Sequence, residues 1–447
     1  MKLKKLVALA MVGVMSLGLV ACGGKDSDSS STSNSNSGDE TKKLERPAKP
    51  AEKDKPTIAL TMWGAEEDQE MLAGMIETFK KEYGDWANFD IQLGVESESK
   101  AKDDIIVDVE AAADVYAFAS DQINDLVKAG ALQALDEDMS VTLETWTGKD
   151  VAGLKAANAS GSVDAATVND KLYAFPMSAD NGYFLYYDSS VLSEDDVKSW
   201  DALLAAADKA GKKVSMTFES GWYNASFFYG AGFTTGLNAD GTTAIDWDGK
   251  ANYTGVEVVQ SMLGIAGHSA FLAAADGDIT NQIASGQLVA AVSGTWDAQA
   301  AQKAFGDGYA ATKLPTFTCA GDQVQQGSVA GFKLVGVNPY SKNVGWAALL
   351  ADWITNEENQ KIRFEKREIG PSNINAAASD AVKNNIAIAA LSEQSAYGVV
   401  QVVGGKFWEP TASFGKNIAS GTVKADDTAG IQELIDAMVE GVTAPVE

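Results

Sequence analysis

Hydrophobic and polar positions alternate with two different periods along the chain from residue 57 onward. Residues 57–63 and 89–95 carry apolar side chains at about every second position, which is typical of a strand with one buried face. Between them, apolar side chains from Met71 to Tyr83 recur every three or four positions, as on the buried face of a helix. Residues 114–118 have the composition of a short buried strand. This succession predicts an α/β fold with largely parallel sheets.

The same rhythm continues through the second half of the chain. We expect further strands at residues 183–187, 213–218, 288–293 and 332–337. We expect helices at residues 123–129, 200–210, 344–364, 386–391 and 431–442. Beyond residue 371 the pattern adds helices without new strands. No internal repeat is present, so a solenoid or a propeller is not expected.

The N-terminus has the pattern of a secretion signal. Lysines within the first five residues precede an apolar stretch over residues 6–20, which is too short for a membrane-spanning helix. The stretch ends just before Cys22 and resembles the bacterial lipoprotein signal, in which such a cysteine is lipidated and becomes the mature N-terminus. We therefore expect a signal peptide at 1–21 and a lipid anchor on Cys22. An ordinary secretory signal with a chance cysteine is the alternative.

Residues 22–56 have the composition of a tether. Ser, Asn, Gly and Asp dominate up to Glu40, and Lys, Glu and Pro follow. Neither part has an apolar period, so we expect a disordered segment that reaches on the order of 30 Å on average. The expected location is the extracellular face of the cell membrane, as in a Gram-positive cell, with the folded body held just off the lipid.

Composition and charge narrow the function further. The 447 residues include 62 acidic and 35 Lys or Arg residues, for a formal charge of −27, and they lack the basic clusters that nucleic-acid binding needs. The length fits two lobes or domains. The single histidine, His268, leaves His-rich zinc sites and His-assisted nucleophiles without partners. Cys319, the one cysteine besides Cys22, is interpreted as a small buried residue.

Aromatic side chains and carboxylates gather at the predicted strand ends and in loops. The aromatic residues are Trp63, Trp222, Tyr223, Trp296 and Trp408. The nearby acids are Glu66, Glu67, Asp68, Asp121, Asp180 and Asp297. Open α/β sheets bind ligands beyond the carboxyl ends of their strands. Sugar rings stack on aromatic faces and their hydroxyls need carboxylate partners, so the set predicts a sugar site, although any one of these aromatics is equally compatible with loop packing.

Enzyme chemistry has weaker support in the sequence. A glycosidase needs two carboxylates across the scissile bond, but a chain with 62 acids always offers such a pair. Phosphate-binding glycine loops, serine-hydrolase elbows and zinc-protease motifs are missing. We therefore expect no catalytic residue, no metal and no cofactor. A secreted glycoside-active enzyme and a surface adhesion lipoprotein are the alternatives.

Several loose motifs occur in a fixed order along residues 57–447. They lie at residues 57–64, 114–121, 129–135, 171–176, 285–296 and 353–360. In this order they resemble the extracellular solute-binding proteins of ABC importers, in the maltose/maltodextrin-binding-like class. The chain departs from that pattern at Ala113, where Pro is usual, at Asp170, where Gly is common, and at Gln122, where some members have Arg.

The resemblance implies a two-lobe, periplasmic-binding-protein-like clamp of type II, with the ligand cleft between the lobes. Lobe 1 would contain residues 57–178 and the return segment 332–367. Lobe 2 would contain residues 180–328 and the C-terminal helices of 371–447. Such a clamp closes on its ligand by hinge motion.

The resemblance also implies the ligand contacts. They are Trp63, Glu66, Glu67, Phe118, Asp121, Asp180, Trp222, Tyr223, Trp296 and Trp408. Asp68 is an alternative to Glu66 or Glu67, because the loop length differs between members. The implied ligand is maltose or a maltodextrin, which a monomer binds noncovalently and passes to the permease subunits of an ABC transporter. Another oligosaccharide is the alternative.

Overall fold

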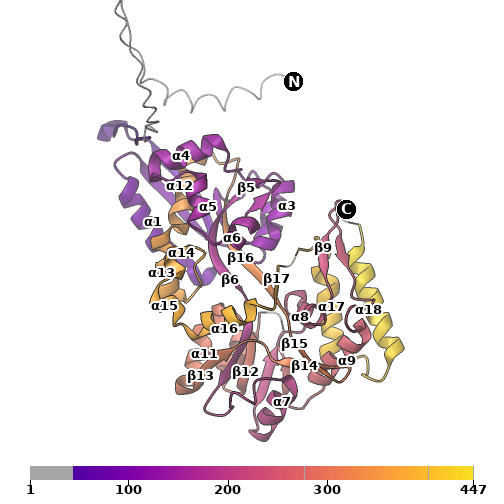
Figure 1. Cartoon of the computed structure of the whole chain (residues 1–447). Coiled ribbons are helices and arrows are strands. Elements are labelled where there is room, and N and C mark those ends of the chain that lie inside the picture. The colour runs from indigo at the N-terminus through magenta and orange to yellow at the C-terminus, as the bar shows by residue number, and fades with distance from the viewer. Residues whose placement is uncertain (1–43, 276, 401, 446–447) are drawn as a thin grey trace, which may run out of the picture.

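The computed structural model describes residues 44–275, 277–400 and 402–445, and these form two α/β lobes (Figure 1). Lobe 1 is built around a six-stranded sheet and lobe 2 around a five-stranded sheet. The predicted signal peptide at 1–21, the lipidation site Cys22 and the tether as far as residue 43 lie outside the described residues. Among the helices that are described, none combines the length and the apolar character that a membrane span requires.

The sheet of lobe 1 has the strand order β17-β16-β3-β1-β2, with β6 beside β16. Its strands are β1 (Thr57–Gly64), β2 (Asn88–Val95), β3 (Val115–Ala119), β6 (Ala174–Gly182), β16 (Ser328–Val337) and β17 (Gly398–Val400). Because β1, β2 and β3 are parallel, their carboxyl ends meet at one edge of the sheet. β16 runs antiparallel to β3 and β6. Ile58, Leu60 and Met62 of β1 point into the core, as their alternation predicts.

Helices cover both faces of this sheet and bury its apolar side chains. They include α1 (Gln69–Tyr83), α2 (Ala101–Val107), α3 (Ile123–Lys128), α4 (Glu137–Thr147), α12 (Val344–Thr355) and α13 (Glu357–Arg367). On α1 the buried residues include Met71, Met75 and Phe79, the face that the sequence predicts. One apolar core therefore joins α1, α4 and α12 to the strands.

The sheet of lobe 2 has the strand order β11-β8-β12-β7-β13. Its strands are β7 (Phe184–Asp188), β8 (Lys213–Met216), β11 (Phe271–Ala273), β12 (Leu288–Ser293) and β13 (Tyr309–Thr312). β8 is parallel to β11 and β12, whereas β7 is antiparallel to β12 and β13. Every residue of β12 is buried, which fits a central strand covered on both faces. Both sheets are thus mixed, and the expectation of largely parallel sheets was only partly right.

The helices of lobe 2 include the C-terminal ones. They are α7 (Trp200–Lys209), α8 (Gly221–Gly230), α9 (Gly255–Ala266), α11 (Ala298–Phe305), α16 (Ile386–Ser395), α17 (Trp408–Ala419) and α18 (Thr428–Thr443). Phe414 and Ile418 of α17 and Ile431 and Ile435 of α18 are buried in one core with α8 and α9. Cys319 is buried in the same core, as expected.

Short segments connect the two lobes. β6 of lobe 1 continues through Tyr183 into β7 of lobe 2, and β16 returns from lobe 2 to the sheet of lobe 1. After α13, the chain passes Gly370, forms α14 (Ile374–Ala377) beside α13 and then reaches α16, which packs on the sheet of lobe 2. The two-lobe α/β architecture that the sequence predicts is confirmed.

Two local predictions in the C-terminal part are wrong. The single helix expected at 344–364 is divided into α12 and α13 at Asn356, which has extended backbone and accepts a hydrogen bond from the Asn359 N–H. A helix N-cap interrupts the apolar pattern there. The C-terminal part also contributes a strand, β17, which pairs with β16 in the sheet of lobe 1.

Residues 44–56, the N-terminal strap, lie against lobe 1, so the tether predicted for 22–56 does not extend to residue 56. Arg46 holds the strap in place. Its guanidinium carbon lies 5.2 Å from the Tyr83 ring, 5.3 Å from the Trp86 ring and 5.9 Å from the Trp146 ring. Its Nε donates to the Trp146 carbonyl over 2.7 Å, and its Nη1 bonds Glu82 over 2.9 Å.

Two further contacts fasten the strap next to Arg46. Lys49 pairs with Asp85 over 2.5 Å, and the Trp86 indole N–H donates to the Pro47 carbonyl over 2.8 Å. The strap then leads directly into β1, where the Pro56 carbonyl accepts from the Asn88 N–H. Its basic side chains thus pair with acids and aromatic faces of lobe 1. Contacts of this kind leave no hydrophobic period in the sequence, so the sequence did not predict that the strap is ordered.

Candidate functional site

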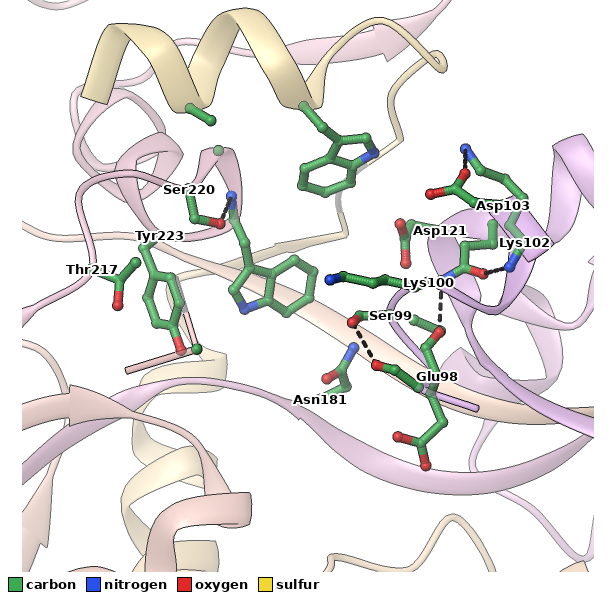
Figure 2. A pocket seen from close by; sticks show the side chains of 18 of the residues that line it. Glu98, Ser99, Lys100, Lys102, Asp103, Asp121, Asn181, Thr217, Ser220 and Tyr223 are labelled. Atoms are coloured by element: carbon green, nitrogen blue, oxygen red, sulfur yellow. Dashed lines mark hydrogen bonds and ion pairs between the residues drawn. The ribbon is translucent and has the colours of Figure 1, made fainter. Parts of the chain in front are cut away.

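A cavity of about 630 Å³ opens between the two lobes, beyond the carboxyl ends of β1, β2 and β3 (Figure 2). Its size is in the usual range for small-molecule sites. Lobe 1 contributes Glu98 and Asp121 to the wall, and lobe 2 contributes Thr217 and Tyr223. The position agrees with the rule that open α/β sheets bind ligands at this edge.

The wall from lobe 2 carries the aromatic side chains of the cavity, beside polar ones such as Glu219, Thr280 and Glu409. Trp222 and Tyr223 come from the first turn of α8, Trp296 from the short helix η5 (Thr295–Asp297), and Trp408 from the first residue of α17. The Ser220 side chain caps α8 by accepting from the Trp222 N–H over 3.3 Å. All three indoles are half-buried, so each has a ring surface left for a ligand. Aromatic platforms from three separate elements therefore meet at one cavity.

The wall from lobe 1 is polar and charged. Its residues are Glu67, Ser97, Glu98, Ser99, Lys100, Lys102, Asp103, Asp121 and Gln122, together with Lys333 of β16. Gln122 fixes the loop after β2, because its side chain donates to the Glu98 carbonyl over 2.7 Å and accepts from the Lys102 N–H over 2.8 Å. Lys333 Nζ lies 3.2 Å from Glu98 Oε2. Glu98 and Lys333 of this wall are thus paired with each other.

Burial changes the acid–base properties of two cavity residues. Desolvation raises the pKa of Asp121 to about 6, and Lys102 opposes that rise. Desolvation disfavours the charged form of Lys333, but Glu98, Asp180 and Asp68 outweigh it and raise the Lys333 pKa above its ordinary value. Lys333 is therefore a fixed cation, whereas Asp121 titrates near neutral pH.

Six of the ten predicted ligand residues line the cavity. They are Glu67, Asp121, Trp222, Tyr223, Trp296 and Trp408. The remaining four lie elsewhere. Phe118 is completely buried in the core of lobe 1, because it belongs to β3 rather than to the loop after it. The structure therefore does not bring the Phe118 side chain to the cavity wall.

Trp63, Glu66 and Asp180 are also outside the cavity wall. The Trp63 ring lies across Gly94 of the neighbouring strand, where an added Cβ would come within 2.8 Å of it. Glu66 is exposed to solvent. Asp180 is buried and accepts hydrogen bonds from Thr295 and Gly370. The structure therefore does not bring these three side chains to the cavity wall.

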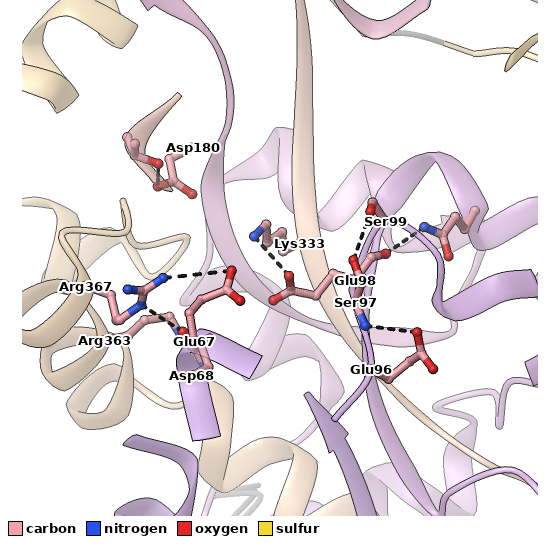
Figure 3. A network of polar contacts seen from close by, with 12 residues as sticks. Glu67, Asp68, Glu96, Ser97, Glu98, Ser99, Asp180, Lys333, Arg363 and Arg367 are labelled. Carbon is pink, nitrogen blue, oxygen red and sulfur yellow. Dashed lines mark hydrogen bonds and ion pairs between the residues drawn. The ribbon is translucent and has the colours of Figure 1, made fainter. Parts of the chain in front are cut away.

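Asp68, the alternative contact, is bound within lobe 1 (Figure 3). It pairs with Arg363, and its other oxygen accepts from Arg367 Nε over 3.0 Å. Arg367 Nη2 also lies 3.9 Å from Glu67. The two arginines of α13 thus hold the loop after β1, which presents Glu67 to the cavity.

Sequence reasoning missed the loop after β2 and Lys333. Ser97, Glu98, Ser99 and Lys100 directly follow the predicted strand 89–95, so the rule for carboxyl ends could have identified them. Lys333 is a lone charge between Phe332 and Leu334 in a predicted strand, which is also a visible signal. Among the residues that the structure describes, no group of three or more His, Cys, Asp or Glu is placed to hold a metal.

Comparisons with known proteins cover both lobes. The model of a family described as bacterial extracellular solute-binding protein matches residues 74–390. A galactooligosaccharide-binding protein of Bacillus subtilis (strain 168) is 25% identical over 455 residues, which cover 96% of this chain and 95% of the relative.

Solved structures agree with this. One in complex with acarbose is 28% identical, with a TM-score of 0.75 over 86% of this chain and 99% of the other. A maltodextrin-binding protein, MalE1 from L. casei BL23 without ligand, is 21% identical, with a TM-score of 0.70 over 87% and 99%. The similarity therefore extends well beyond a single motif.

Proposed function

Because the chain belongs to the bacterial extracellular solute-binding protein family, we propose that it captures an oligosaccharide outside the cell for uptake by an ABC importer. Members of this family bind a solute and do not transform it, which removes the secreted enzyme from the alternatives. The observation that carries the proposal is that aromatic rings and many polar groups line one cavity. Three indoles from lobe 2 face carboxylates, hydroxyls and ammonium groups of lobe 1.

This combination of aromatic and polar groups suits a sugar. The C–H faces of pyranose rings stack on indoles, and their hydroxyls donate to carboxylates or accept from ammonium groups. Trp222, Trp296 and Trp408 lie on three separate elements, which favours a chain of several rings over a monosaccharide. Asn181 on the connecting strand β6 adds an amide to the same wall.

We propose a malto-oligosaccharide as the ligand. Solved structures that resemble the chain contain acarbose or are described as maltodextrin-binding, which supports α-glucan chemistry. A galacto-oligosaccharide is the second candidate, favoured by the Bacillus relative named for it. Closure of the two lobes on the ligand would create the form that the permease recognises, and Cys22 would anchor the protein at the outer face of the cell membrane.

Calorimetric titration of the chain without residues 1–21 tests this function. The ligands are maltose, maltotriose, maltotetraose and galacto-oligosaccharides of matched length, with cellobiose as the control. We expect saturable binding that strengthens from maltose to maltotriose, with the sugar recovered intact. Binding of the galacto-oligosaccharides alone would move the ligand to the second candidate. Failure of every oligosaccharide to bind would reject the proposed function.

The affinity is expected to fall below about pH 6 because of Asp121. Its pKa is raised to about 6 by burial. A sugar hydroxyl donates to the ionised carboxylate, so binding favours the deprotonated form and is opposed by protonation. The dissociation constant should rise about fivefold from pH 6 to pH 5 if the ionised form is required. Calorimetry over pH 5–7 measures this change.

Asp121→Asn is the matched control for that pH dependence. It should bind more weakly at all pH values and show a flat profile in the same range. Retention of the full pH dependence in this variant would assign the titration to another group, such as the buried Asp297, whose pKa is also raised by desolvation.

A further inference from the structure

Asp180 lies where three segments of the chain meet. It belongs to β6, which connects the lobes, and it is 3% exposed. Its Oδ2 accepts from the Thr295 hydroxyl over 2.6 Å and from the Gly370 N–H over 2.6 Å. Thr295 precedes the cavity residue Trp296, and Gly370 lies in the turn after α13. One buried carboxylate oxygen therefore ties an aromatic platform of lobe 2 to a helix end of lobe 1.

The other side of Trp296 is fixed as well. Asp297 is 1% exposed, and it accepts from the Thr280 hydroxyl over 2.6 Å and from the Ser293 hydroxyl over 2.5 Å. A Cβ at Gly294 would lie 2.2 Å from a carbon of the Trp296 ring, so this ring packs directly on backbone. Thr295, before Trp296, is thus bonded to a buried carboxylate, and Asp297, after it, is itself a buried and bonded carboxylate. These bonds set the position of the indole before a ligand arrives.

The turn after α13 makes its own contacts with lobe 2. Glu368 has φ +58°, and its carboxylate accepts from Gln302 of α11 over 3.1 Å and from Asn385 over 2.7 Å. Gln299 of α11 donates to the Lys366 carbonyl over 3.0 Å. Since α11 directly follows η5, a rotation of lobe 2 against α13 has to change these contacts and the position of Thr295 together.

We propose that Asp180 is a positioning residue that fixes Trp296 for sugar stacking through Thr295 and couples that ring to the hinge through Gly370. The predicted effect of Asp180 on sugar affinity rests on the proposed function, whereas its predicted effect on the hinge does not. Asp180 does not line the cavity, whereas its neighbour Asn181 does. Its influence on a ligand therefore passes through Trp296.

A double-mutant cycle tests the first half of the proposal. Asp180→Ala and Thr295→Val should each weaken oligosaccharide binding about tenfold, the scale of a lost hydrogen bond to a charged group. In the Trp296→Ala background, Asp180→Ala should cause little further loss, because its effect needs the indole. Thr355→Val, a buried threonine of α12 in lobe 1, is the matched control and should leave affinity unchanged. A fully additive loss in the double variant would mean that Asp180 affects binding without the Trp296 indole, and would overturn its role in positioning that ring.

Lobe separation tests the second half without any ligand. Spin labels at Lys81→Cys in lobe 1 and Lys209→Cys in lobe 2, in a chain with Cys22→Ser, report the distance distribution between the lobes. We expect Asp180→Ala to broaden or shift this distribution and Asp180→Asn to do so less. Thr295→Val and Trp296→Ala should leave it unchanged, because the Gly370 bond remains.

The two halves fail differently. A wild-type distribution in Asp180→Ala would overturn the coupling to the hinge. If the wild-type protein binds no oligosaccharide, the proposed function fails and the positioning of a sugar platform fails with it, while the distance measurement still decides the hinge coupling. If Asp180→Ala does not fold, Asp180→Asn takes its place in both experiments.

Discussion

Replacing Asp68 with Asn is expected to lower the free energy of unfolding by about 3–5 kcal/mol, the range for a buried ion pair that loses one partner. Arg363 and Asp68 have side-chain exposures of only 1% and 4%, and they are in direct contact. Nε and Nη2 of Arg363 have no hydrogen-bond partner among the described residues, so Asp68 is the group that compensates this buried charge. In the variant the guanidinium would stay buried without a counter-charge.

Urea titration followed by circular dichroism measures this loss. The matched control is Asp195→Asn, because Asp195 pairs with Lys198 at side-chain exposures of 87% and 71%. That exposed pair should contribute less than about 1 kcal/mol. Asp68→Leu combined with Arg363→Met should recover much of the loss, since it removes both charges at once. Equal, small effects of Asp68→Asn and Asp195→Asn would contradict the burial of the Asp68 pair.

Replacing Trp296 with Ala is expected to weaken oligosaccharide binding by about 1–3 kcal/mol, or about 5- to 150-fold in Kd. The indole lines the cavity and is half-buried, so its loss removes contact area for the sugar but leaves the core of lobe 2 in place. Trp222→Ala and Trp408→Ala should act in the same direction. Calorimetry gives the affinity, and thermal unfolding shows whether the fold survives.

Trp63→Ala is the matched control for the three indoles. Trp63 is also half-buried, but its ring lies over Gly94 and does not line the cavity, so its removal should leave affinity unchanged. Loss of binding in Trp63→Ala would extend the site beyond the cavity. A large drop in melting temperature for Trp296→Ala would show instead that this ring supports the fold.

The period of hydrophobic residues predicted most helices and strands, because each of these elements buries one apolar face. The apolar face of α1 and the buried strand β12 were predicted within a few residues of their observed bounds. The division at Asn356 escaped this reasoning, since apolar residues continue on both sides of it and only the hydrogen bond to the Asn359 N–H marks the new helix. Local capping decided that boundary and hydrophobicity did not.

Residue types in the sequence predicted part of the site. The roles of the other residues depend on contacts with side chains far away in the sequence. The indoles of Trp222, Trp296 and Trp408 were identifiable because aromatic residues and acids stand together at predicted strand ends and in loops, a pattern that suggests a sugar site. Asp180 looked equivalent to Asp121 in the sequence. Its role depends on Thr295, which is 115 positions away, and no local pattern reveals that pair.

The strap determines where the chain leaves the folded body. It joins β1 at Thr57, whereas the cavity lies beyond the other end of this eight-residue strand, about 26 Å away at 3.3 Å per residue. A shortened chain that begins at Thr57 would expose the faces of Tyr83 and Trp86 and leave Glu82 without Arg46. A fusion junction therefore belongs ahead of Leu44. A dye, bead or electrode attached there would leave the cavity facing solvent, which suits this protein to immobilised sensing of its ligand.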